Sequence, residues 1–524
     1  MTTSSVRNRV RRRKSSQSLV LRPAGKIDQQ VQEVGPEHFG IVSIDCAKAR
    51  SKLMLCDFFG NVLVPPTEVE HQASDLNNVI DSIRQAIVAA DIRKSIVAIE
   101  RTGNYHLPTQ RAFRAAGFTT RVVHPYASRQ YRQPASPGVK TDDKDLAGIH
   151  RAAMAGFALL QQALPPDAIR LQLLVRHRRD LVRKSSALCC QTREHLHQMM
   201  PGYAELFEER LWTSTLAMPI AIRFHSAQAV LNAGLEGLES FLREAEINFQ
   251  RKSLFQIVGW AKIATPPDPD AELRFTMLES LYGDLCQKKR EISLLEVGSA
   301  ELLAATPYLL LMAIPGINVI TAAELAGEMG PITDYANANA ITGRAGLFPG
   351  RYQSDQTDQQ RMPLVRCANK RLRNAVMQIA ENLICCNDFF RTLAASWKLQ
   401  KLPTRRQRVK VARRFSRIAF SMVAGQQVFP HACCREPDYM LNKLLTFILE
   451  RKAELETIER TLLAATRQIP GSRRKAEADS MSQNAQQAAR KRGGTRKLPE
   501  LLNLVVARLI GQPLQLRTED AASN

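Results

Sequence analysis

Residues 39–64 read FGIVSIDCAKARSKLMLCDFFGNVLV, and this stretch sets the architecture of the N-terminal domain. Short apolar runs predict strands over 41–45, 52–56 and 61–64, and the turn at Phe59-Gly60 precedes the last of them. Short connections between three successive strands predict an antiparallel meander.

The pattern after the meander alternates between helix and strand. Apolar spacing predicts helices over 76–90, 107–116 and 142–155. Strands are predicted over 96–99 and 120–123, and the first of these is wholly apolar, as strands buried on both faces are. A meander followed by alternating helices and strands is the order of a ribonuclease-H-like α/β domain.

Acidic residues stand at the ends of these predicted elements. Asp45 and Glu100 each close an apolar strand, so neighbouring strands would bring them to one crevice. Asp142 and Asp145 are three positions apart at a helix start, about 60° from each other, whereas Asp143 points to another side. Four carboxylates in one place repel each other unless a cation such as Mg²⁺ neutralises them. The alternative is separate surface acids, with Asp142 as a helix N-cap.

A serine two hundred residues later is a second candidate for chemistry. Ser354 lies in GLFPGRYQSDQTD (residues 346–358), whose Gly, Pro, Gln and Asp content predicts a loop. A loop serine is most often a turn or capping residue, and the alternative is a nucleophile. Four arginines surround it in sequence and could hold a phosphate, namely Arg344, Arg351, Arg361 and Arg366.

The remainder of the chain reads as mostly helical. The pattern over residues 166–305 predicts two long helices that flank a middle segment. Such an arrangement is typical of a coiled-coil or helical-hairpin spacer, which serves dimerisation or extends the protein. A compact helical domain follows, and then helices over 441–467 and near 498–510, joined by a polar linker that we expect to be disordered. Residues 1–35 predict a disordered basic arm.

Two further stretches suit phosphate. LMAIPGINVITAAELAGEMG (residues 311–330) reads as helix, Pro-Gly hairpin and helix, and a helix N-terminus after such a turn exposes backbone N–H groups. An ordinary packed hairpin is the alternative. KLPTRRQRVKVARRFSR (residues 401–417) has eight basic and no acidic residues, so it predicts a surface that tracks a nucleic-acid backbone, or else a solvated helix face.

The net charge points to a polyanionic partner. The chain of 524 residues holds 73 Lys and Arg against 50 Asp and Glu, a net charge of +23. No apolar run approaches the roughly 20 residues that span a bilayer, so no membrane association is expected. Ten cysteines without a C-x-x-C pair predict reduced thiols in a cytoplasmic protein.

These motifs together resemble the DEDD transposases of the insertion-sequence one-ten family, which are bridge-RNA-guided recombinases. The N-terminal resemblance is carried by IVSIDCAKAR (41–50), AIERTGNYHLPTQRAFRAAGF (98–118), VVHPYASRQ (122–130) and VKTDDKDLAGIHRAAMAG (139–156). The C-terminal resemblance is carried by the stretch 311–330, ITGRAGLFPGRYQS (341–354) and CANKRLRNAVMQIAENL (367–383). Both halves occur in the order and spacing of the family.

The resemblance implies a RuvC-like catalytic domain and a serine nucleophile. The acidic tetrad of the family corresponds to Asp45, Glu100, Asp142 and Asp145, and its nucleophile corresponds to Ser354. The metal that the resemblance implies is Mg²⁺. It also implies double-stranded donor and target DNA, a guide RNA from the element, and a homodimer or homotetramer in which tetrad and serine come from different subunits. This chain departs from the family with Asp355 after Ser354, where Ser-Gly is usual, with Asn318 in the hairpin and with Ala368-Asn369.

The sequence therefore predicts a cytoplasmic, nucleoid-associated, Mg²⁺-dependent transposase that exchanges DNA strands through a transient phosphoserine bond. The alternatives are a RuvC-like junction resolvase that uses metal-activated water, and a nucleic-acid-binding regulator without catalysis. The expected division is a basic arm 1–35, a RuvC-like α/β domain 36–165, a helical spacer 166–305, a helical transposase domain 306–425 with a helix-hairpin-helix-like element, and a helical tail 426–524. The predicted nucleic-acid contacts are Gly316, Arg344, Arg351, Arg361, Arg366, Lys370, Arg371, Arg373, Arg405, Arg406 and Arg408.

Overall fold

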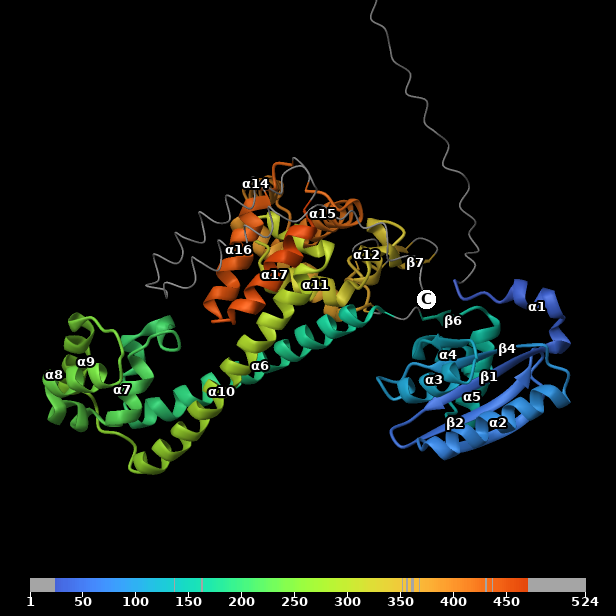
Figure 1. The fold of residues 1–524 in the computed structure, drawn as a ribbon, viewed down its shortest axis with the longest axis horizontal. Helices are drawn as coiled ribbons and strands as arrows, with labels where there is room; N and C mark the ends of the chain where they lie inside the picture. The colour runs from blue at the N-terminus through green and yellow to red at the C-terminus, as the bar shows by residue number, and fades with distance from the viewer. Residues whose placement is uncertain are drawn as a thin grey trace, which may run out of the picture. The chain divides into compact units, whose positions relative to one another are not determined.

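The computed structural model describes residues 24–135, 137–161, 164–350, 352–354, 357–359, 362–366, 368–428, 431–435 and 437–469. The chain forms two compact units, Met1–Ala163 and Leu164–Asn524, each of which is described by itself (Figure 1). The first 23 residues, the polar linker after residue 470 and the helix expected near 498–510 lie outside the described residues.

The first unit is built on a six-stranded sheet. Its strands are β1 Phe39–Cys46, β2 Arg50–Asp57, β3 Val62–Glu70, β4 Lys94–Glu100, β5 Thr120–Val123 and β6 Ala158–Leu160, in the spatial order β3-β2-β1-β4-β5-β6. β1, β2 and β3 form the antiparallel meander, β4 and β5 run parallel to β1, and β6 is antiparallel to β5. The expected strands are confirmed, and the order is that of a ribonuclease-H-like domain.

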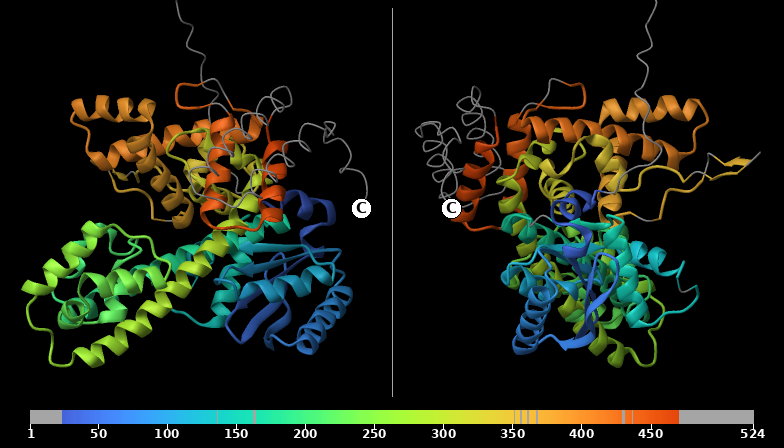
Figure 2. Two further views of the ribbon diagram at one scale, coloured as in Figure 1. Left: turned by 60° about the vertical axis from the view of Figure 1, so that its left-hand side comes forward. Right: turned by 90° about the vertical axis from the view of Figure 1, so that its right-hand side faces the viewer.

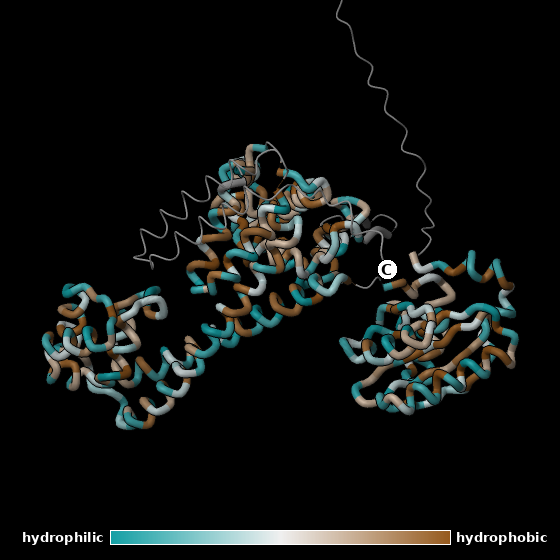
Figure 3. The backbone as a smooth tube through the Cα atoms, in the orientation of Figure 1, coloured by the Kyte–Doolittle hydropathy of each residue, from teal (hydrophilic) through white to brown (hydrophobic). Residues whose placement is uncertain are grey.

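Helices cover both faces of this sheet. α2 (Ala73–Ala89) and α3 (His106–Ala115) pack on one face, where Val42 and Ile44 of β1 meet Ile83 and Phe113. α5 (Asp142–Met154) packs on the other, where Phe39 and Ile41 meet Ile149. Side chains alternate along a strand, so odd-numbered residues of β1 face α5. The hydropathy trace shows the apolar strands between these layers (Figure 3).

Four short elements of this unit differ from the expectation, and one of them is the 3₁₀ helix η1 (Pro36–His38) before β1. Helix α4 (Pro125–Arg132) and strand β6 follow β5 and α5, and neither was expected, because eight and three residues are too few to show a period. The arm expected to be disordered over 1–35 contains helix α1 (Asp28–Val34). Its Val31 is buried together with Ile27, and Arg121 donates a hydrogen bond of 2.8 Å to the Gly25 carbonyl, so tertiary contacts order the segment.

The described part of the second unit consists of helices and one small β-hairpin. Two helices of 34 residues, α6 (Pro166–Met199) and α10 (Ala271–Ala304), pack along each other (Figure 1). Between them the chain forms η2 (Ala204–Leu206), η3 (Glu208–Arg210), α7 (Ala217–Phe224), α8 (Ala227–Glu244) and α9 (Arg251–Ile263). These elements enclose a core of their own around Tyr203, Leu211 and Leu254, which we call the distal core.

The remaining elements form a helical body around a second, larger core. They are η4 (Pro307–Ala313), α11 (Val319–Met329), η5 (Ile332–Asp334), α12 (Ala338–Arg344), β7 (Tyr352–Ser354), β8 (Thr357–Gln359), α13 (Lys370–Cys386), α14 (Asp388–Leu399), α15 (Thr404–Gly425), α16 (Pro437–Glu450) and α17 (Leu455–Arg467). The helix expected over 441–467 is two helices, since the backbone of Lys452 has a positive φ of 51° and turns the chain. The ends of α6 and α10 belong to the core of this body through Leu171, Val175 and Leu303.

Buried ion pairs tie α6 to the helical body. Three arginines on one stretch of α6 meet carboxylates of α10 and α11 whose residues are at most 8% exposed. The pairs are Arg176 with Glu328 (2.8 Å), Arg178 with Glu296 (2.7 Å) and Arg179 with Glu324 (2.5 Å), and Arg451 also reaches Glu296 (2.5 Å). Removing one partner of such a pair leaves an uncompensated buried charge at a cost of about 3–5 kcal/mol, so loss of one of these glutamates should destabilise the junction.

Among the described residues, no single helix has the length and apolar character needed to cross a membrane. Taken together by length and composition, α10 and η4 would pass such a test, but they meet at a bend of 104°.

Candidate active site

The candidate site lies at one end of the sheet in the first unit. Asp45 occupies an odd position of β1 and Glu100 an even position of β4, and both positions face α5, as do Ile41 and Ile96. In the parallel pair of β1 with β4, Ile44 lies opposite Ile99. The residues that follow, Asp45 and Glu100, therefore leave adjacent strands at the same end and on the same face.

Helix α5 brings two more carboxylates to this place. Its N-cap is Thr141, whose hydroxyl accepts a hydrogen bond from the Lys144 N–H at 3.4 Å, so Asp142 is not the cap. Carboxylate oxygens of Asp45, Asp142 and Asp145 lie within 4.8 Å of one another. Asp142 is exposed, Asp45 is half-buried and Asp145 is buried. The structure thus gathers three of the four predicted acids into one group, which we call the acidic cluster.

The fourth acid, Glu100, lies beside the acidic cluster but outside that group. The Ser128 hydroxyl of α4 donates a hydrogen bond of 2.6 Å to its carboxylate. Burial raises the pKa of Glu100, and the negative charge of Asp45 raises it further, while Ser128 lowers it. Because Glu100 is electrostatically coupled to Asp45, it remains part of the same constellation.

Burial and mutual repulsion also act on Asp45. Its pKa is raised first by burial and second by the negative charge of Asp142. The Lys140 ammonium opposes both effects, on Asp45 and on Glu100 alike. A buried carboxylate that repels its neighbours is the electrostatic state that a bound cation relieves.

The neighbouring acid Asp143 makes a different contact. Its carboxylate lies 2.7 Å from the ammonium of Lys52, which stands opposite Asp45 in the pairing of β1 with β2. The Asp143 side chain is 60% exposed. Asp143 is therefore engaged in a surface ion pair and is not among the three acids of the cluster.

One positively charged side chain, that of Arg132, contacts the acidic cluster. The Arg132 guanidinium at the end of α4 donates a hydrogen bond to the Asp145 carboxylate, and both residues are only 9% exposed. It also lowers the pKa of Glu100. The sequence did not mark Arg132 or Ser128, because α4 is short and their contacts join distant parts of the chain.

The residues present fit a divalent cation. Three carboxylates converge within a few ångströms, and hard cations such as Mg²⁺ or Mn²⁺ take carboxylate oxygens as ligands. Burial and the negative charge of Asp142, which both raise the pKa of Asp45, supply the physical reason for a positive ion at this position. Asp45, Asp142 and Asp145 would hold such an ion, with Glu100 adjacent.

Ser354 lies in the second unit. The sequence predicted a loop at this position, but the structure has a strand there. Its backbone ends β7 and pairs with Thr357 of β8 in a two-stranded antiparallel hairpin. The hairpin extends away from the helices of the body (Figure 2). The expectation was wrong because hydrogen bonding across the hairpin forms strands that polar composition does not predict. Asp355, Arg351 and Arg361 lie outside the described residues.

The base of this hairpin is clamped by one arginine. Arg373 of α13 donates hydrogen bonds to the carbonyls of Ala345 (2.8 Å), Gly346 (3.3 Å) and Val365 (2.5 Å), which lie before and after the hairpin. A Cβ on Gly346 would clash with this guanidinium. Arg373 therefore has a structural role at the base of the hairpin, and its expected role as a nucleic-acid contact stays a prediction.

The other predicted nucleic-acid contacts fall into two groups. Exposed residues are Arg366, Lys370 and Arg371 near the start of α13, and Arg405 and Arg406 in the first turn of α15. Two further arginines have partners within the protein. Arg408 forms an ion pair with Glu381 at 2.6 Å, and exposed Arg344 donates a hydrogen bond to the Tyr335 hydroxyl at 2.6 Å.

The hairpin turn at Gly316 is packed against α13. Gly316 has a φ of +98°, and a Cβ there would lie 3.0 Å from the Asn382 carbonyl oxygen, so glycine suits this turn. Asn318 caps α11 in a capping box with Thr321, which occupies two of the backbone N–H groups that were expected to face a phosphate. The element before the turn, η4, is a 3₁₀ helix and not an α-helix.

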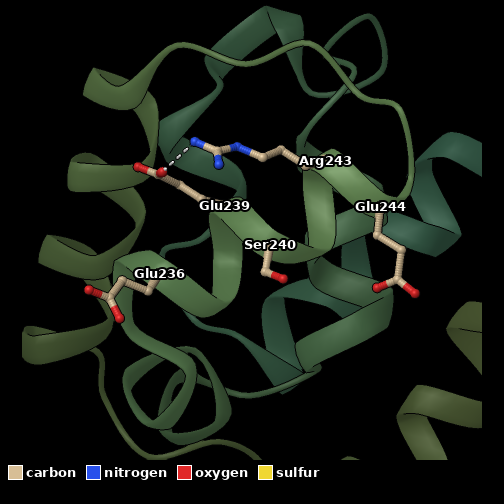
Figure 4. Close-up of a pocket in the computed structure, with 5 residues that line it drawn as sticks. All are labelled: Glu236, Glu239, Ser240, Arg243 and Glu244. Carbon is tan, nitrogen blue, oxygen red and sulfur yellow. Dashed lines mark hydrogen bonds and ion pairs between the residues drawn. The ribbon is translucent and has the colours of Figure 1, made fainter.

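A hollow of about 590 Å³ lies beside α8 in the second unit. Its lining is acidic, with Glu236, Glu239 and Glu244 around Ser240 and Arg243 (Figure 4). The buried acid Glu239 is already neutralised by Arg243 at 3.2 Å and by Arg251 at 2.5 Å. This hollow therefore has neither free buried acids for a metal nor a positive surface for phosphate.

Comparison with known proteins gives two family matches and no curated relative. Residues 42–201 match the family model of DEDD transposases of the IS110 type, and residues 308–395 match the model described as Transposase IS116/IS110/IS902 family. The first match contains the acidic cluster and the second contains the hairpin of Ser354. No curated protein sequence matches the chain.

Proposed function

This chain belongs to the IS110 family of transposases, enzymes that act on DNA, and we propose that it cuts and rejoins DNA with the acidic cluster and Ser354 as its two chemical centres. The convergence of Asp45, Asp142 and Asp145 at the end of a ribonuclease-H-like sheet is the observation that carries the proposal. The four acids Asp45, Glu100, Asp142 and Asp145 form its catalytic tetrad.

The tetrad serves to bind a divalent ion, which we take to be Mg²⁺. Such an ion, when bound, supplies Lewis-acid polarisation of a phosphodiester and stabilises charge on the leaving oxygen. Asp45, Asp142 and Asp145 would be its ligands, since their oxygens already converge. Glu100 holds its place through Ser128 and adds negative charge beside Asp45.

Ser354 serves as the nucleophile in this proposal. Its Oγ forms a bond to phosphorus, the bond from phosphorus to one DNA oxygen breaks, and the serine proton leaves with the DNA hydroxyl so released. The phosphoserine ester keeps the energy of the phosphodiester for rejoining. The position of Ser354 in a hairpin that extends from the helical body suits an approach to DNA.

The partners follow from the family resemblance. We propose double-stranded donor and target DNA, a bridge RNA that selects the target by base pairing, and a homodimer or homotetramer in which the tetrad of one subunit acts with Ser354 of another. The proposal also includes action in the nucleoid. It divides the chain into five parts, namely an arm 1–35, a catalytic domain 36–165, a coiled-coil spacer 166–305, a transposase domain 306–425 with its helix-hairpin-helix-like turn, and a tail 426–524.

The proposal is tested by trapping protein on labelled DNA that carries the ends of the element, with guide RNA and Mg²⁺ present. We expect a covalent protein–DNA adduct that disappears when the metal is chelated. Mass spectrometry of the adduct after nuclease digestion should place the nucleotide on Ser354. Metal-dependent cleavage without any adduct would support a resolvase that uses water, and an absence of cleavage would support a regulator.

Helix α15 supplies a positive surface for the DNA backbone. Arg405, Arg406, Lys410 and Arg413 are exposed, and the Lys410 ammonium lies 5.0 Å from the ring centre of Trp397 on α14. Each neutralised phosphate releases counterion, so binding should weaken steeply with salt.

Replacing both Arg405 and Arg406 by alanine should weaken DNA binding about equally for unrelated sequences. The slope of log affinity against log salt should become shallower by about one for each phosphate that is no longer neutralised, measured by fluorescence anisotropy. The control is Arg391→Ala on α14, which removes a charge already paired with Asp388 at 3.0 Å. An equal weakening by the control would mean that net charge matters and that α15 does not.

A further inference from the structure

Helix α4 contacts the acidic site with two residues one turn apart. Ser128 and Arg132 are 5% and 9% exposed, and positions i and i+4 of a helix share one face. Ser128 donates to Glu100 at 2.6 Å and Arg132 donates to Asp145. One face of α4 therefore holds two of the four acids, from two different elements.

The backbone of α5 is shaped for this contact. A Cβ on Gly148 would lie 2.7 Å from the Ser128 carbonyl oxygen and 3.1 Å from the Arg132 Cβ. Only glycine permits so close an approach, and it occurs at the turn of α4 that carries both residues. Asp145 lies on α5 one turn before Gly148, so this close packing places the arginine against Asp145.

The charges around Arg132 explain why a cation is needed there. A buried carboxylate without a partner is costly, and Asp145 is the most buried of the three clustered acids. Among the described residues, the Lys140 ammonium also acts on Asp45 and Glu100, and Lys52 pairs with Asp143. Arg132 is the group that meets Asp145 itself.

We propose that Arg132 is an internal counter-ion, which neutralises Asp145 in the metal-free protein and must share or yield that carboxylate when a divalent ion binds. The inference rests on the proposed function of the acidic cluster as a metal site. A fixed positive charge next to a metal site opposes metal binding by Coulomb repulsion. Arg132 therefore keeps the acids together without metal and at the same time weakens the binding of the ion.

The test is a titration of the full-length protein with Mn²⁺ alone, without DNA, in which free Mn²⁺ is measured by electron paramagnetic resonance. Arg132→Gln should bind Mn²⁺ about fivefold more tightly than the wild type or better, since one positive charge is removed a few ångströms from the ion. The melting temperature of the metal-free variant should be lower by several degrees, because Asp145 loses its partner. Arg129→Gln is the matched control, an exposed arginine of the same helix, and should change neither quantity.

A second variant keeps the inference testable if Arg132→Gln does not fold. Gly148→Ala keeps the arginine but forces α4 away from α5, so Mn²⁺ should raise its melting temperature by more than it raises that of the wild type. Gly259→Ala in α9, where a Cβ would meet nothing within 4 Å, is its control and should match the wild type.

The outcomes distinguish a failure of the counter-ion role from a failure of the metal site. Unchanged or weaker Mn²⁺ binding by Arg132→Gln, with the wild type binding Mn²⁺, would overturn the counter-ion role and leave the metal site standing. A wild-type protein that binds no Mn²⁺ would overturn the metal site and the inference with it.

Discussion

Ser354→Ala should abolish both the covalent protein–DNA adduct and recombination, with a loss of about a thousandfold or more, because no other group can form the phosphoserine ester. DNA affinity should stay near that of the wild type, since one hydroxyl adds little to an interface made by many cations. The measurements are the yield of trapped adduct on labelled DNA, the rate of strand exchange and the affinity by anisotropy.

Ser354→Cys is the matched variant, because it keeps a nucleophilic side chain of similar size at the end of β7. We expect a trace of adduct from this variant and none from Ser354→Ala. Near-normal recombination by Ser354→Ala would refute the covalent mechanism. Metal-dependent cutting by that variant, with no adduct from either protein, would leave a resolvase that uses water.

Loss of any clustered acid should remove strand cleavage while the protein stays folded. Each of the variants Asp45→Ala, Asp142→Ala and Asp145→Ala removes one of the three converging carboxylates that would bind the proposed cation. Loss of a group that only supports a metal ligand costs about 10- to 100-fold, so loss of a ligand should cost more than about a hundredfold. Glu100→Ala should fall in the same range. Cleavage is measured on radiolabelled DNA, and folding by circular dichroism.

Asp143→Ala is the control for this prediction, because Asp143 is adjacent in sequence but paired with Lys52. An exposed ion pair contributes at most about 1 kcal/mol, so cleavage should change by less than about fivefold. A loss at Asp143 as large as that at Asp142 would contradict the assignment of the cation to Asp45, Asp142 and Asp145.

The sheet of the first unit was predictable because its strands show their pattern locally. Apolar runs ending in Asp45 and Glu100 indicated both the strands and the end at which the acids emerge. The spacing of Asp142 and Asp145 likewise predicted a shared helical face, and both belong to the acidic cluster. Periodicity of two or of 3.6 residues is a property of neighbouring residues, so a sequence displays it directly.

Interactions between distant segments could not be predicted in this way. Nothing near Arg132 in sequence shows that it meets Asp145, and nothing near Ser128 shows that it holds Glu100. The strands around Ser354 depend on pairing across a hairpin, and the clamp by Arg373 depends on a helix that follows it. Polar composition predicted a loop because it carries no information about these partners.

The buried ion pairs at the base of α6 have a mechanical consequence. Two helices of 34 residues, each about 50 Å long, begin or end in the core of the helical body and reach the distal core at their other ends. Ion pairs of Arg176, Arg178 and Arg179 join α6 to α10 and α11 at the junction with the body. We therefore expect a partner bound at the distal core to influence the position of the body that carries Ser354 through these two helices.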